Sequence, residues 1–266
     1  MSTAADALLR TPHMDNASRT AYRYALYLAP AQPWWDVGSS WLGRCAATGQ
    51  ALERHDSADP RIDAWTRAPR LYGLHATLKP PFRLRDQVCP RDVDSAARAL
   101  AGAFSAFDVP LRRRRLRGFM AWCLDEGDAS AIRAMRKLAD AAVTELDALR
   151  APLTDAERAR RSLEQLSANQ RAMLDRWGYP YVLDEFTFHI TLTNALPDAQ
   201  LEQAGRAFDD QAGGAGLPEV MPVDAVSVYV QPEPGSPFVV ARHYGFDGSI
   251  TDAVGAAWLA GVGASA

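Results

Sequence analysis

Two short segments of the sequence place a histidine and a threonine at the same spacing. His75 and Thr77 lie in LHATL, and His189 and Thr191 lie in FHITL. Side chains alternate between the two faces of a strand, so each histidine shares a face with its threonine, opposite apolar residues. One histidine can accept a proton while the other donates one, and each hydroxyl can bind a phosphoryl oxygen without adding charge. We therefore predict a metal-free site for displacement at phosphorus, with His75 and His189 catalytic and Thr77 and Thr191 binding phosphate.

A structural interpretation competes with this one, because a histidine and a threonine on a half-exposed strand are usually no more than a polar face. The duplication weighs against it. Two of only five histidines share the pattern, and each lies inside an apolar strand in a different half of the chain. An unperturbed histidine titrates near ~6.5, which predicts a bell-shaped rate profile with a maximum at roughly pH 6–7.5 unless burial shifts the pair.

The elements that position these residues alternate between strands and helices. The predicted strands are 22–28, 74–78, 111–124, 184–193, 223–230 and 238–246, and the predicted helices are 34–54, 92–107, 130–177 and 199–211. We expect Pro80 and Pro81 to end the second strand, and Pro152 to divide the long helical stretch. This order predicts an α+β fold whose sheets are covered by helices on one side only.

The paired motifs resemble those of the 2H phosphoesterases, whose hallmark is two H-x-[ST] motifs on the central strands of two lobes. HAT at 75–77 and HIT at 189–191 match, and hydrophobic residues bracket both. The segments LHATLKPPF and FHITLT are similar to a branch of that superfamily encoded with phosphonate-degradation genes. The resemblance spans about residues 22–246. It implies two pseudo-symmetric antiparallel-sheet lobes with outer helices around a central cleft, and a metal-independent phosphoesterase acting on a cyclic phosphate or a small phosphodiester.

The same interpretation sets the domain limits and the expected ligands. Residues 1–20 are expected to be a flexible lead-in, 21–250 a single two-lobed domain with a helical insert at about 130–178, and 251–266 a tail. The expected partner is a small phosphorylated or cyclic-phosphate substrate, with nucleotides and ribose phosphates as candidates. No cofactor and no metal are expected, because no cluster of His, Asp and Glu has metal-ligand spacing.

Further candidates come from the alternation of side chains along a strand and from residue type. Alternation places Lys79 beside His75 and Thr77 as a third phosphate ligand, and places Thr193 on the polar face of the second motif. Tyr27 and Tyr229 could stack on a base, although aromatic residues on strands belong more often to a core. Arg117 adjoins the basic run at 112–115, which is either a solvated strand face or a collar that attracts a phosphorylated substrate.

Composition excludes several other classes of protein. The chain has 266 residues, 48% of them hydrophobic, and a net charge of −3, so binding of bulk nucleic acid through overall charge is not expected. No stretch approaches the ~20 apolar residues of a membrane span, and the first residues do not resemble a secretory signal. Three separated cysteines, Cys45, Cys89 and Cys123, form no CxxC pair. We therefore expect a cytoplasmic protein without membrane association. P-loop, HExxH and GxSxG motifs are absent from the sequence.

Two other functions fit the same residues. One is phosphotransfer on an RNA end, including ligase-like or cyclic-phosphate-forming chemistry. The other is a module that binds a phosphorylated ligand without turning it over. Loss of turnover when either histidine is replaced separates an enzyme from a binding module, and binding to an RNA end separates the two enzymes. The residues alone leave open the substrate and which histidine is the base.

Overall fold

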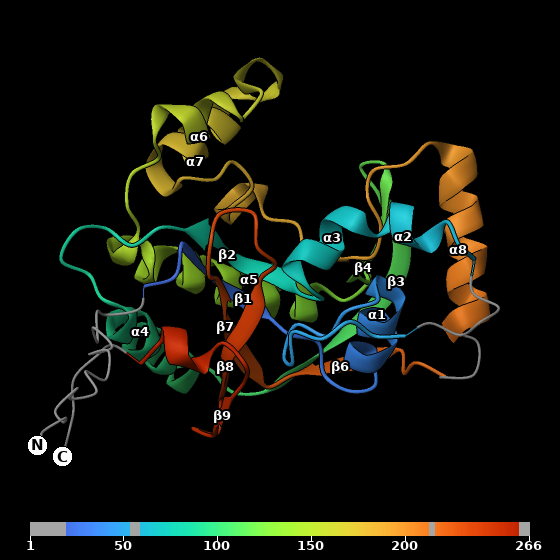
Figure 1. The fold of residues 1–266 in the computed structure, drawn as a ribbon, viewed down its shortest axis with the longest axis horizontal. Coiled ribbons are helices and arrows are strands. Elements are labelled where there is room, and N and C mark those ends of the chain that lie inside the picture. The colour runs from blue at the N-terminus through green and yellow to red at the C-terminus, as the bar shows by residue number, and fades with distance from the viewer. Residues whose placement is uncertain (1–19, 54–58, 213–215, 261–266) are drawn as a thin grey trace, which may run out of the picture.

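The strands of this chain form a continuous antiparallel sheet with helices packed against it (Figure 1). The computed structural model describes residues 20–53, 59–212 and 216–260. Most of the expected lead-in, the last six residues of the expected tail and residues 213–215 therefore lie outside the described residues. None of the described helices is both long enough and apolar enough to cross a membrane.

In the described residues the sheet has nine strands. Across the sheet they are β6 (Val220–Val223), β3 (Phe107–Leu116), β4 (Phe119–Leu124), β5 (His189–Thr191), β2 (Ala76–Phe82), β1 (Arg23–Leu28), β7 (Ala225–Gln231), β8 (Val239–Gly245) and β9 (Ile250–Asp252). Every pairing is antiparallel. Strands β5 and β2 pair through one residue on each side, so two half-sheets meet there. The predicted α+β fold is confirmed.

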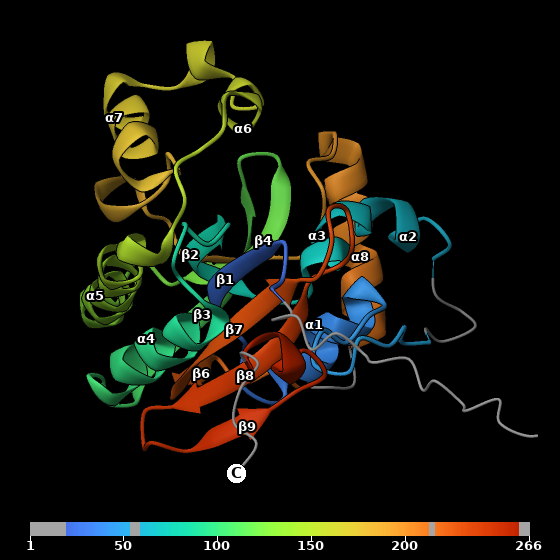
Figure 2. The ribbon, with the colours of Figure 1, turned by 60° about the vertical axis from the view of Figure 1, so that its left-hand side comes forward.

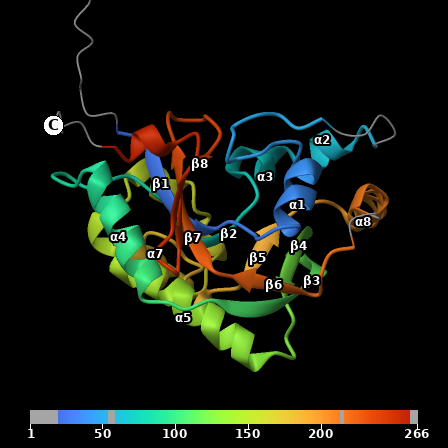
Figure 3. The same ribbon diagram turned by 90° about the horizontal axis from the view of Figure 1, so that it is seen from below.

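Helices pack against both half-sheets. The helices of the described residues are α1 (Trp34–Leu42), α2 (Ile62–Trp65), α3 (Arg67–Tyr72), α4 (Pro90–Gly102), α5 (Ala129–Glu145), α6 (Asp155–Ala159), α7 (Ala168–Trp177) and α8 (Asp198–Ala212). Short 3₁₀ turns occur at Asp147–Leu149, Leu163–Gln165, Leu183–Glu185 and Ala256–Trp258. Helix α4 packs on β7 and β8, α5 on β2 and β3, and α8 on β4 (Figure 3). Helices α6 and α7 stand away from the sheet (Figure 2).

The main hydrophobic core lies between the sheet and the helices that pack on it, α1, α4, α5 and α8 among them. It contains the apolar residues of both motif strands, including Ala76 and Ile190, together with Trp41 and Trp122. The Trp41 indole N–H in α1 donates a hydrogen bond of 2.8 Å to the carbonyl of Leu192, just past β5. Burial of large apolar side chains is the main stabilising term here. The core therefore fixes the face that each motif presents away from the helices.

Several expected elements are shorter than the sequence pattern predicts. The helix expected at 34–54 ends at Leu42, because Gly43 adopts a left-handed conformation (φ 73°) that caps it. The strand expected at 184–193 keeps only His189–Thr191, since a 3₁₀ turn occupies Leu183–Glu185. The expected strand at 111–124 is a hairpin. Its turn at Arg117 and Gly118 has φ values of 47° and 87°, which suit a two-residue hairpin turn.

Strand β2 continues through Pro80 and Pro81, contrary to the expectation that they end it. Proline cannot donate a hydrogen bond, so inside a sheet it is confined to edges and bulges. Here the pairing with β1 is irregular around these residues, and β5 pairs with β2 only at Ala76. The two prolines therefore occupy positions where the regular ladder requires no N–H donor.

The same irregularity overturns the expected role of Lys79. Between the pairs Tyr27–Thr77 and Leu26–Lys79, β2 advances two residues while β1 advances one, which is a bulge. The bulge breaks the alternation, and Lys79 turns toward α5. Its Nζ donates 2.9 Å hydrogen bonds to the carbonyl of Val143 and to Asp147 Oδ1, and its side chain is 0% exposed. The prediction that Lys79 binds substrate phosphate is therefore wrong.

The buried pair of Lys79 and Asp147 leads to a stability prediction. Asp147→Asn should lower the free energy of unfolding by about 3–5 kcal/mol, because it leaves the Lys79 ammonium buried without a counter-charge. Lys79→Met should cost less, since Asp147 keeps its 2.8 Å ion pair with Arg150. Urea unfolding of both variants measures the difference. A larger loss in Lys79→Met than in Asp147→Asn would contradict the assigned role of the carboxylate.

Candidate active site

The two motifs meet centre to centre in the sheet. Ala76 of β2 pairs with Ile190 of β5, and both side chains are buried, at 1% and 0% exposure. In antiparallel pairing the flanking positions also face each other, which sets His75 opposite Thr191 and Thr77 opposite His189. Because side chains alternate, all four polar side chains lie on the face away from the helical core. The structure thus brings together the four residues that the spacing singled out.

Each histidine makes the same local hydrogen bond. His75 Nδ1 lies 2.8 Å from the carbonyl oxygen of Gly73, and His189 Nδ1 lies 2.8 Å from that of Thr187. A carbonyl can only accept, so Nδ1 carries the proton and Nε2 is left with a lone pair when the ring is neutral. Gly73 has φ 76°, and a Cβ there would lie 2.5 Å from the Ala46 Cβ. Glycine is therefore required at the position whose carbonyl orients His75.

His75 rests on a buried aromatic cluster. The Tyr27 ring stacks on the imidazole, with centroids 3.8 Å apart and planes inclined by 20°. The Tyr229 hydroxyl donates a 2.9 Å hydrogen bond to the carbonyl of Leu74, beside the motif. Both tyrosines are almost fully buried, in a small core with Ala25, Ala46, Phe238 and Val240. Both tyrosines hold His75 and its neighbouring backbone in place from the buried side. Because they are buried, the expectation that they contact substrate is wrong.

His189 opens onto a cavity of about 260 Å³. The residues that line it are Thr77, Leu78, Pro80, Leu116, Arg117, Phe119, Tyr179, Tyr181, Val182, Glu185, Phe186, Thr187 and His189. Arg117, at the tip of the β3–β4 hairpin, lines this cavity, and its guanidinium lies 4.7 Å from the centroid of the Tyr181 ring. The cavity therefore combines one motif histidine, the threonine opposite it and a cation.

Burial changes the protonation of both histidines. The pKa of His75 is lowered to about 4, chiefly by burial; the hydrogen bond to Gly73 opposes this shift, and the nearby His189 contributes to it. The pKa of His189 is also lowered, first by burial and then by the charge of Arg117. Desolvation disfavours the charged imidazolium, which explains both directions. In the ligand-free protein both rings are therefore mainly neutral at neutral pH.

Thr193, another sequence-derived candidate, does not reach the site. Thr193 is buried, and its Oγ1 accepts a 2.9 Å hydrogen bond from the Met120 N–H. The N–H groups of Leu192 and Thr193 both approach the carbonyl of Met120, so the alternation of β5 is broken after Thr191. The expectation that Thr193 contacts substrate is therefore wrong.

The basic run at 112–115 is neutralised rather than free to attract substrate. Its ion-pair partners are Asp125 and Glu219 for Arg112, Asp209 for Arg113, Asp125 and Glu126 for Arg114, and Asp198 for Arg115. This is the solvated strand face that was one of the two interpretations. Within the described residues, no three His, Cys, Asp or Glu side chains are grouped so as to hold a metal ion.

Sequence reasoning missed three residues near the motifs. Tyr179 and Glu185 line the cavity beside His189, in a segment without clear periodicity. Tyr72 is partly exposed, with its ring centroid 6.1 Å from that of His75, and it stacks on Phe238. The only local signal was the concentration of aromatic residues just before each motif.

Comparisons with known proteins place the chain in a family. Residues 77–239 match the family described as "Protein of unknown function (DUF1045)". Two curated relatives are both named "Ribose 1,5-bisphosphate phosphokinase PhnN". The Janthinobacterium sp. (strain Marseille) protein is 38% identical over 250 residues, covering 89% of this chain and 53% of that protein. The Laribacter hongkongensis (strain HLHK9) protein is 33% identical over 226 residues, covering 83% and 51%.

Among solved structures, E. coli LigT complexed with ATP aligns at 11% identity and a TM-score of 0.39, covering 85% of this chain and 98% of that one. Kluyveromyces marxianus Usb1 aligns at 10% identity and a TM-score of 0.36, covering 83% and 98%. The chain spans about half the length of the two curated relatives. The family match covers more than half of this chain and runs from Thr77 through the whole second motif, and the protein belongs to the DUF1045 family.

Proposed function

We propose that this protein is a metal-independent phosphoesterase of the 2H type, which opens a cyclic phosphate or hydrolyses a small phosphodiester. One observation carries the proposal: the central residues of HAT and HIT pair with each other, Ala76 with Ile190. That pairing gathers two imidazoles and two hydroxyls on one face of the sheet. Acid–base catalysis at phosphorus needs one group that accepts a proton and one that donates a proton to the same reacting centre.

The proposed reaction uses each histidine once. His75, with the pKa lowered to about 4, is neutral, and its Nε2 takes a proton from the attacking water as the new P–O bond forms. The bond to the leaving oxygen breaks, and protonated His189 donates its proton to that oxygen. The hydroxyls of Thr77 and Thr191 donate hydrogen bonds to the non-bridging phosphoryl oxygens, where charge develops in the transition state. The anionic phosphate of a bound substrate favours the protonated form of His189.

Small phosphorylated riboses are the substrate class that we propose to test first. The relatives' printed name refers to a ribose bisphosphate, and the 2H resemblance suggests cyclic phosphates and a role in phosphonate metabolism. A cavity of about 260 Å³ beside His189 favours a small substrate over a long polymer. The kinase activity in that name is not transferred, because this chain spans only about half of those proteins.

The first test of this proposal concerns the two histidines. His75→Ala and His189→Ala should each slow hydrolysis of a 2′,3′-cyclic nucleotide by about 100- to 10,000-fold, because one proton transfer is left unassisted. His243→Ala is the control: this histidine lies on β8, where its Nδ1 contacts Ser227, and the rate should stay the same. Initial rates with EDTA present provide the measurement.

Each other outcome of that assay has a clear meaning. Near-normal turnover in either motif variant would exclude the paired mechanism. Activity lost in EDTA and restored by a divalent ion would overturn metal independence. Ligand binding without turnover by the unmodified protein would favour a binding module, and activity confined to RNA ends would favour phosphotransfer on RNA.

The threonines provide the second test. Thr77→Val and Thr191→Val should each lower kcat by about 10- to 1000-fold while preserving the fold, because each removes a hydrogen bond to the transition state. Thr251→Val, on exposed strand β9, is the matched control and should leave kcat unchanged. Steady-state kinetics and circular dichroism separate a catalytic loss from unfolding. Unchanged kcat in both motif variants would show that the hydroxyls have no part in the reaction.

The third test is the pH dependence. Catalysis requires a free protein in which His75 is neutral and His189 is protonated. His75 is neutral above about pH 4, and His189 is protonated only below its lowered pKa. The profile of kcat/KM should therefore be bell-shaped with a maximum between about pH 4 and 6.5, more acidic than unperturbed histidines would give. Arg117→Gln should move the alkaline limb to higher pH, because it removes a cation that lowers the His189 pKa.

Arg115→Gln is the control for this shift, since Arg115 is paired with Asp198 on the outside of the hairpin. The NMR titration of the His189 ring should move in the same direction as the alkaline limb in Arg117→Gln. A His189 titration that is identical in Arg117→Gln and in the unmodified protein would contradict the electrostatic role of Arg117.

A further inference from the structure

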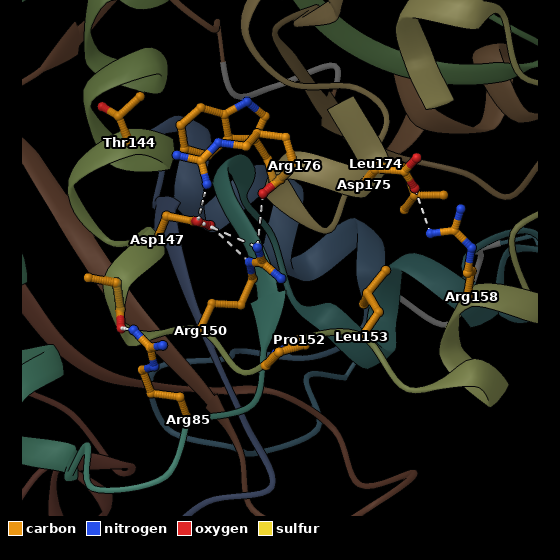
Figure 4. Close-up of a pocket in the computed structure, with 12 residues that line it drawn as sticks. Arg85, Thr144, Asp147, Arg150, Pro152, Leu153, Arg158, Leu174, Asp175 and Arg176 are labelled. Atoms are coloured by element: carbon orange, nitrogen blue, oxygen red, sulfur yellow. Dashed lines mark hydrogen bonds and ion pairs between the residues drawn. The ribbon is translucent and has the colours of Figure 1, made fainter. Parts of the chain in front are cut away.

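A larger cavity lies outside the candidate active site, where α5, the turn Asp147–Leu149 and α7 come together (Figure 4). Its volume is about 640 Å³, within the range of roughly 300–1,000 Å³ that is typical of small-molecule sites. The reaction proposed above uses none of the residues that line it. The side chains that matter here are four arginines, two aspartates and one tryptophan: Arg85, Arg150, Arg158, Arg176, Asp147, Asp175 and Trp177.

The charges in this cavity do not balance. Asp147 is shared between buried Lys79 and Arg150, and Arg176 approaches it only to 3.9 Å. The second aspartate, Asp175, forms an ion pair of 2.5 Å with Arg158. Figure 4 shows Arg150 and Arg176 converging on Asp147, while the Arg158–Asp175 pair lies apart. Two carboxylates therefore face four guanidiniums and one ammonium.

Two of the arginines keep N–H groups available for a ligand. Arg85 donates a 3.1 Å hydrogen bond to the carbonyl of Ala148, and among the described residues it forms no ion pair. The Arg176 side chain is 69% exposed and lies 4.5 Å from the centroid of the Trp177 ring. Arg150, in contrast, is engaged with Asp147 and with the carbonyl of Arg176. Arg85 and Arg176 are thus the groups that can bind an anion without breaking a close ion pair.

We propose that this cavity is a second binding site, for a small molecule that carries a phosphate or pyrophosphate group. Guanidinium N–H pairs match the spacing of phosphate oxygens, and such charge-assisted hydrogen bonds are the strong ones. Because the site is a cavity and not a flat surface, it favours a small soluble molecule over a large partner with an extended contact surface. Lys79 points to this side of β2 and Thr77 points to the other, so the cavity is separate from the face that carries both histidines.

Isothermal titration calorimetry with pyrophosphate tests the proposal. The titrations use the Thr77→Val/Thr191→Val background, which removes the proposed phosphate ligands of the active site. In that background we expect saturable binding, and the further change Arg85→Gln/Arg176→Gln should raise the Kd about tenfold or more. Both arginines are on the surface, so their replacement should leave the thermal unfolding midpoint unchanged. In the otherwise unmodified protein, Arg85→Gln/Arg176→Gln should leave turnover of a cyclic nucleotide unchanged.

The matched control is Arg112→Gln/Arg115→Gln, which removes the same charge from the β3 face and should change the Kd less than twofold. Three results would overturn the proposal: no binding of pyrophosphate at millimolar concentration, the same Kd with and without Arg85 and Arg176, or an equal loss in the control. The last result would show that only the overall charge attracts the anion. The proposal does not depend on catalysis, because binding is measured in a background impaired in the active site.

Discussion

The candidate site depends on the antiparallel pairing of Ala76 with Ile190, the one pair that joins β2 to β5. Its register is specified by burial, because both side chains enter the main core and their neighbours face outward. A slip of one residue would turn the histidines toward the helices and the apolar residues toward water. The Trp41 hydrogen bond to Leu192 holds the end of β5 to α1, on the core side. The geometry of the four polar residues is therefore a product of core packing.

The local alternation of the motifs was enough to predict their exposed faces. His75, Thr77, His189 and Thr191 lie on the predicted face because alternation holds within each three-residue motif. Lys79 and Thr193 each lie two residues beyond a motif threonine, where alternation fails. A bulge depends on the pairing partner, and a single sequence does not reveal that partner. Side-chain alternation therefore predicts the face of a residue reliably only where the strand pairing is regular.

Larger features show the same division between local and long-range information. The α+β class and the approximate positions of most strands followed from periodicity and turn residues. The order of the strands did not, because β5 is joined to both β2 and β4 by contacts between distant parts of the chain. The neutralised arginines on β3 illustrate the point for charge. Their partners Asp198, Asp209 and Glu219 are remote in sequence, so the run alone could not distinguish a collar from a paired surface.

The hydrogen bonds from the two imidazoles run to carbonyls only two residues back along the chain. Many enzymes orient a histidine with a carboxylate supplied by a distant part of the chain, so that the pair must evolve together. Here the tautomer is specified by the backbone that directly precedes each motif. Each half of the site is consequently a short cassette that carries its own orienting group. Such a cassette can arise by duplication of a single segment, and it is a natural unit for transplanting onto another β-sheet.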